Sequence, residues 1–133
     1  MKLVHGLDPV RLDLKLIKKY QGKVDNARSR KIEFNLTYAQ YKRIMTRKRC
    51  AYTGVELTMH MHSGSPTGND VTLERISSDI GYTVENCIAV SFSANNVKSV
   101  FEDPRTPLSV SDAIKMFANI DKIQKKQKER LTQ

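Results

Sequence analysis

The sequence predicts a small, mainly helical α+β protein, in which a strand–loop–strand–helix unit is flanked by N-terminal and C-terminal helices. The chain has 133 residues, a usual size for one domain, so a single domain over 1–133 is expected. Apolar positions suit helices near both ends, and two strand-like runs lie between 71 and 91. The expected divisions are a basic helical lead-in over 1–49, the central unit over 50–100, and a C-terminal helix with a basic tail over 105–133.

The first helix is predicted to begin after Asp8, a suitable N-cap, with Pro9 in its first turn. Its many lysines form either a solvated face or one that contacts phosphates, and the sequence leaves both interpretations open. Thr37 and Gln40 have the spacing of a capping box before a second helix over about 38–45. A basic cluster at its end is expected to bind DNA phosphates, unless it is only a solvated helix end. The cluster consists of Lys42, Arg43, Arg47, Lys48 and Arg49.

The centre of the chain alternates between turn and strand patterns. Residues 50–54 have the composition of a tight turn and 59–68 that of a loop. Residues 71–76 alternate like a strand, 87–91 form a second apolar strand, and 94–100 turn helical. This order is the coarse shape of a ββα unit.

The last helix is predicted to begin near Ser109, with apolar residues on one face that are expected to lie in the core. These residues are Val110, Ala113, Ile114, Phe117, Ile120 and Ile123. The basic tail that follows, over 125–130, is expected to fray.

The amino-acid composition limits the classes of function to be expected. Twenty-three Lys and Arg against fourteen Asp and Glu give a net charge of +9, which favours a polyanionic partner over a merely soluble basic protein. No stretch has the length of a membrane span and no signal-peptide core is evident, so a cytosolic protein without membrane contact is expected. Cys50 and Cys87 are expected to be reduced thiols, because a single possible pair is far from the dense disulfide framework of a small secreted protein. Two cysteines also cannot build a four-cysteine zinc site.

Three ordered segments carry a resemblance to a known family: residues 72–76 (TLERI), 81–86 (GYTVEN) and 94–98 (ANNVK). They resemble the ββα-metal (HNH) endonucleases, especially small, often phage-encoded members with an S-L-D-R-I-D, G-Y-T-x-x-N and N-x-x-K pattern. With a matching lead-in upstream, the resemblance covers about residues 20–100. It implies a central ββα-metal unit that hydrolyses DNA with a divalent cation, Mg²⁺ or Mn²⁺.

In zinc-bearing relatives, four cysteines pin the turn to the final helix. At those positions this chain has Cys50, Thr53, Ser91 and Ala94. Three of the four ligands are missing, so no structural zinc is expected. Packing by Tyr52, Phe92 and Val97 is expected to take the place of the metal.

The resemblance also implies the site residues. Glu74 and Asn95 match the metal ligands, and the catalytic set adds Arg75 and Asn86. Arg75 stands where many HNH enzymes have a histidine base; because a guanidinium stays protonated, it is expected to clamp a phosphate instead. Asn86 is expected to fix the loop to the strand through its amide. Lys98 is expected either to face a DNA phosphate or to be an ordinary exposed lysine.

Two departures from the family pattern bear on activity. Ser77 stands where these relatives have a second acid, which weakens the expected catalysis. His60 and His62, in the loop before the first strand, offer a replacement base or are simply solvated.

The resulting hypothesis is a metal-dependent DNA endonuclease of HNH type, of homing or other mobile-element kind. The first alternative is a catalytically weakened relative that binds DNA as a repressor or inhibitor. The second is a module that binds an acidic protein. The sequence leaves the DNA target and the oligomeric state open.

Overall fold

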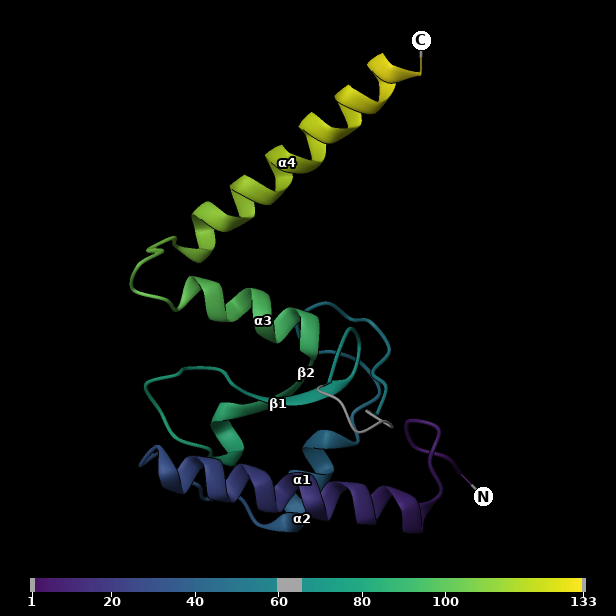
Figure 1. Ribbon diagram of the computed structural model, residues 1–133, viewed down its shortest axis with the longest axis vertical. Coiled ribbons are helices and arrows are strands. Elements are labelled where there is room, and N and C mark those ends of the chain that lie inside the picture. The colour runs from purple at the N-terminus through teal and green to yellow at the C-terminus, as the bar shows by residue number, and fades with distance from the viewer. Residues whose placement is uncertain (1, 60–65, 133) are drawn as a thin grey trace. The chain divides into compact units, whose positions relative to one another are not determined.

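The computed structural model describes residues 2–59 and 66–132 (Figure 1). The predicted α+β class is confirmed: the described residues form four α-helices and a two-stranded antiparallel sheet. Where the sequence favoured one domain, the chain divides into two compact units, Met1–Val97 and Lys98–Gln133. The first unit holds the sheet and most of the expected site residues.

Helices α1 (Pro9–Ser29) and α2 (Tyr38–Met45) begin where the sequence predicted. The Asp8 side chain accepts the backbone N–H of Arg11, which caps α1. Thr37 and Gln40 form the predicted capping box of α2. The two helices pack against each other, and α2 also contacts both strands of the sheet.

Strands β1 (Val71–Arg75) and β2 (Cys87–Ser91) pair antiparallel, with Val71 opposite Ser91 and Arg75 opposite Cys87. The short 3₁₀ helix η1 (Val84–Asn86) leads into β2. An isolated bridge joins Phe34 to Tyr82, so the segment before α2 lies against the loop between the strands. The strands therefore match the sequence-based expectation, with β1 one residue shorter.

The core of the first unit is assembled from α1, α2 and both strands. Its fully buried side chains include Leu16, Tyr41, Met45, Val71 and Val90. Burial of such side chains is worth roughly 1.5–3 kcal/mol each, so this cluster dominates the stability of the unit.

Helix α3 (Phe92–Phe101) follows β2 directly, two residues earlier than predicted. Helix α4 (Val110–Leu131) begins after Ser109, whose side chain accepts the N–H of Asp112. Two expectations for α4 need correction. Of its expected core face, Ala113 is buried, whereas Val110, Ile114 and Ile123 are 65–70% exposed. The basic tail is helical as far as Leu131 rather than frayed.

The exposure of that face has a local explanation. Within the second unit, the apolar residues of α4 have little to pack against besides α3, where the ring of Phe101 meets that of Phe117 edge-on at 6.3 Å. Helical periodicity shows that a face is apolar, whereas burial needs a partner surface. None of the helices in the described part of the chain has the length and apolar character needed to cross a membrane.

Candidate functional site

The end of β1 carries Glu74 and Arg75, the first pair of expected site residues. Glu74 is 9% exposed although it is a carboxylic acid. Arg75 Nη1 donates hydrogen bonds to the carbonyl oxygens of Ser78, at 2.8 Å, and Ile80, at 3.1 Å. Its guanidinium also lies over the Tyr82 ring, 5.1 Å from the centroid. In this arrangement Arg75 braces its own loop, whereas a phosphate clamp was expected.

Asn86 joins the two ends of that loop, as expected from its amide. Its Oδ1 accepts the N–H of Ser77 at 3.0 Å, and its Nδ2 donates to the carbonyl oxygens of Ser77, Ile80 and Gly81 at 3.0–3.1 Å. The side chain is 6% exposed. Asn86 therefore positions the end of β1.

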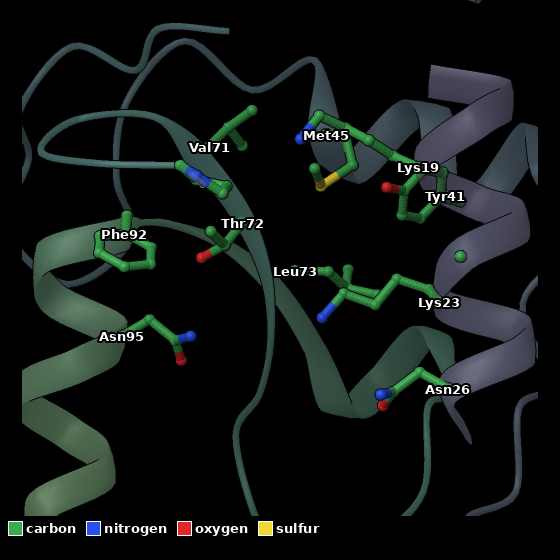
Figure 2. A pocket seen from close by; sticks show the side chains of 12 residues that line it. Lys19, Lys23, Asn26, Tyr41, Met45, Val71, Thr72, Leu73, Phe92 and Asn95 are labelled. Atoms are coloured by element: carbon green, nitrogen blue, oxygen red, sulfur yellow. The ribbon is translucent and has the colours of Figure 1, made fainter. Parts of the chain in front are cut away.

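A cavity of about 410 Å³ lies between α1, α2, β1 and the start of α3. Figure 2 shows Lys19 and Lys23 extending from α1 toward β1, with Phe92 and Asn95 on the other side of the strand. Asn95 and Thr72 line the same cavity, and Thr72 shares a face of the sheet with Glu74 because side chains alternate along a strand. The fold thus brings Asn95 to the strand that carries Glu74.

The surroundings of the two cavity lysines lower the pKa of both side chains. Burial lowers the pKa of Lys23, opposed by the negative charge of Glu74 and reinforced by Arg30 and Lys19. Burial likewise lowers the pKa of Lys19, opposed by the charge of Asp70. Each half-buried ammonium therefore has a carboxylate near it and a second cation that repels it.

These lysines are functional candidates that the sequence did not single out. They belong to the basic arm whose role was left open, and their spacing of four residues was the available signal, since residues four apart share a helix face. By contrast, Lys18 and Arg28 on the same helix are exposed. The lysines that face the cavity beside β1 can be told from the solvated cations of α1 by their burial in the structure, not by their sequence.

Glu74 and Asn95 are the side chains that could hold the expected divalent cation. Mg²⁺ is commonly held by one or two carboxylates together with waters and substrate phosphates. Glu74 supplies a buried carboxylate and Asn95 an amide oxygen at the same strand. In the described ranges, no three His, Cys, Asp or Glu side chains are grouped to hold a metal. A site here would therefore depend on substrate phosphates and water for its other ligands.

The expected DNA-binding residues differ in their surroundings. Lys42 forms an ion pair with Asp13 at 2.9 Å, and Lys98 one with Glu102 at 3.3 Å. Arg49 donates a hydrogen bond to the carbonyl of Gly54. The side chains of the remaining three are exposed: Arg43, Arg47 and Lys48. Lys98 belongs to the second compact unit and the other five to the first.

The four positions at which the resemblance implies zinc ligands are linked here by hydrogen bonds. The sulfur of Cys50 accepts the backbone N–H of Thr53 at 3.4 Å and of Ser91 at 3.2 Å, and Ser91 Oγ accepts the N–H of Ala94 at 3.1 Å. Burial raises the pKa of Cys50, but the hydrogen bonds it receives, led by that of Thr53, lower it to about 7 overall.

The expected replacement for zinc was therefore wrong in part. Tyr52 and Val97 are 42% and 48% exposed, so they do not fill that space, and Phe92 is half-buried at the cavity. A thiol that accepts hydrogen bonds from both sides ties the turn to the start of α3 instead.

One of the three histidines, His5, lies among the described residues. His60 and His62, the expected replacement bases, lie outside the described residues. The ring nitrogens of His5 lie near two carbonyl oxygens, Nδ1 3.1 Å from that of Leu57 and Nε2 2.8 Å from that of Met45, and a neutral imidazole donates a hydrogen bond to one of them. It ties the N-terminal segment to the turn after α2.

Comparisons with known proteins show a sequence similarity between this chain and a curated phage protein. No family model and no solved structure matches the chain. It is 32% identical over 74 residues to an uncharacterized 29.0 kDa protein in the dda-modA intergenic region of Enterobacteria phage T4. The match covers 56% of this chain and 28% of the phage protein, so the chain spans less than a third of that relative. The chain is thus similar over part of its length to a phage protein.

Proposed function

We propose that this chain is a metal-dependent DNA endonuclease of HNH type. The observation that carries the proposal is the order β1–η1–β2–α3 with a buried acid, Glu74, at the end of the first strand and Asn95 brought to that strand from the following helix. The resemblance implies metal ligands at these two positions. A buried carboxylate is retained at a cost in desolvation, which is easier to explain at a site that uses it.

The charges around the acid suit phosphodiester chemistry. When bound, a divalent ion would be held by Glu74 and Asn95 and would polarise a phosphate oxygen or activate water. Lys19 and Lys23 would neutralise phosphate oxygens beside it. Arg75 and Asn86 would act as positioning residues, because their polar groups fix the loop that follows the acid.

Plasmid cleavage tests the proposal. Supercoiled DNA is incubated with the protein and Mg²⁺, Mn²⁺ or chelator, for wild type, Glu74→Ala and the control Glu85→Ala, which removes an exposed acid from η1. Wild type and Glu85→Ala are expected to cut with metal. Glu74→Ala is expected to lose cleavage but keep DNA affinity, because a metal ligand acts on the chemistry while Lys and Arg hold the backbone.

The opposite pattern would refute the enzyme. If wild type cuts no DNA with any divalent ion and Glu74→Ala changes neither metal binding nor DNA affinity, no nuclease site exists at this strand.

A second candidate is a DNA-binding protein without cleavage. It is favoured by Ser77 in place of the second acid and by Arg75, whose guanidinium bonds two loop carbonyls. With a net charge of +9, this protein should bind duplex DNA with a steep salt dependence. Replacing Arg47, Lys48 and Arg49 together by Gln should make the slope of log K against log salt less steep by about 2–3. An unchanged slope would move the DNA contact away from this cluster.

A further inference from the structure

We infer that the cavity between α1 and β1 binds one unpaired nucleotide of a single-stranded nucleic acid. The inference rests on the proposed function for its polyanionic partner, and it goes further by naming the form of the substrate. The cavity, of about 410 Å³, falls in the range of pockets for small ligands and is too narrow for a duplex. A nucleotide must therefore leave its helix, or come from a single strand, to enter it.

One wall of the cavity suits a phosphate. Lys19 and Lys23 reach across it from α1 (Figure 2). Their positive charges are crowded by Lys15 and Arg30 and opposed by the carboxylates of Asp70 and Glu74. Four cations against two acids leave the region positive. An anion between the two lysines would relieve their mutual repulsion and replace water lost through burial.

Asp70 is already engaged within the protein. Its carboxylate accepts hydrogen bonds from the hydroxyl of Thr58 at 2.8 Å and from the backbone N–H of Thr67 at 3.0 Å. These hydrogen bonds stabilise part of the negative charge of Asp70 within its own loop. Asp70 therefore competes less strongly with a phosphate for Lys19.

The opposite wall suits a base. Phe92 presents a half-buried aromatic ring on the side of the cavity away from α1 (Figure 2). Bases of any sequence stack on aromatic rings, so this wall would bind a base with little sequence preference.

Polar groups between these walls can read the base or sugar. Asn26, Asn95 and Thr72 line the cavity with amide and hydroxyl groups. Tyr41 is 0% exposed and lines it too, yet its hydroxyl has no hydrogen-bond partner among the described residues. A buried unsatisfied hydroxyl costs about 1–3 kcal/mol, and a bound nucleotide would supply the partner only after the cavity wall shifts to expose it.

Fluorescence anisotropy in chelator tests the inference. The probes are a labelled oligothymidylate and the same strand annealed to its complement. The variants are Lys19→Gln with Lys23→Gln, Phe92→Leu, and Phe92→Tyr, which keeps the ring. The matched control is Lys18→Gln with Arg28→Gln, which removes the same charge from exposed positions of α1.

Each variant has its own expected signature. Phe92→Leu should weaken single-strand binding at least about fivefold with an unchanged salt slope, because it removes stacking but no charge. Phe92→Tyr should bind like wild type. The cavity lysine pair should make the single-strand slope less steep by about 1.4. Both cavity changes should lower the ratio of single-strand to duplex affinity, whereas the control pair should leave that ratio unchanged.

Three outcomes would overturn the inference. The ratio of single-strand to duplex affinity could change no more in the cavity variants than in the control, or the cavity variants could lose equal affinity for both probes. The third is that inorganic phosphate displaces the oligothymidylate as well as thymidine monophosphate does. Because the assay contains no metal, it is independent of cleavage. A chain that shows the expected ratios yet cuts nothing keeps this inference and refutes the nuclease. A chain that cuts DNA but shows no change in the ratio refutes this inference alone.

Discussion

Asn86→Ala is expected to destabilise the first compact unit strongly, because one buried amide closes the loop after β1. The amide has four hydrogen-bond contacts: Oδ1 accepts the N–H of Ser77, and the two hydrogens of Nδ2 are shared among the carbonyls of Ser77, Ile80 and Gly81. Each is worth about 0.5–1.5 kcal/mol net. The Ile80 carbonyl keeps its hydrogen bond from Arg75 Nη1, so the total loss should be about 2–4 kcal/mol.

A loss of that size is easily measured. For a unit of this length, it lowers Tm by about 10–25 °C. Urea unfolding should show a lower midpoint with an unchanged m-value, which separates lost stability from a change in the denatured state. Asn35→Ala is the matched control, because that side chain is exposed and only its backbone N–H bonds Tyr82; its effect should stay within about 0.5 kcal/mol.

Asn86→Asp sharpens the test. The new carboxylate can still accept from Ser77 but cannot donate to three carbonyl oxygens, so it should cost at least as much as Asn86→Ala at neutral pH. Asn86→Ala within about 0.5 kcal/mol of wild type would refute the idea that this amide holds the loop.

Three further outcomes are expected in the ligand-free protein. Gly81→Ala should lower the free energy of unfolding by about 1–3 kcal/mol, because the added Cβ would lie 2.6 Å from the backbone oxygen of Glu33. Gly22→Ala, with open space around it in α1, should raise the free energy of unfolding by about 0.5–1 kcal/mol. Equal urea midpoints for the two variants would contradict this. Tyr41→Phe should raise Tm by removing an unsatisfied buried hydroxyl, and a drop in Tm would show that the hydroxyl has a partner. The pKa of Cys50 is lowered from 9.0 to about 7 by folding, so its thiolate should stabilise the protein by at most about 3 kcal/mol, fully above pH 9 and not at all below pH 7. Urea unfolding of wild type and Cys50→Ser across that window should diverge as pH rises, and parallel curves would contradict a lowered pKa.

The sequence by itself determined the elements and much of the order of the fold. Asp8, the Thr37–Gln40 pair and Ser109 marked helix starts correctly, because a cap depends on groups within three residues. The two strands were also found, since each is a short run with its own burial pattern. The role of Asn86 in fixing its loop followed from the resemblance, and its hydrogen bonds agree with it.

Only the tertiary structure decided which side chains face one another. Lys19 and Lys23 resemble their neighbours in sequence, but the position of α1 relative to β1 makes them line a cavity. Arg75 points into its own loop because the carbonyls of Ser78 and Ile80 lie within reach. The apolar face of α4 has the periodicity of a core helix yet is largely exposed. Periodicity records which residues share a face, whereas burial and charge neighbours depend on surfaces from distant parts of the chain.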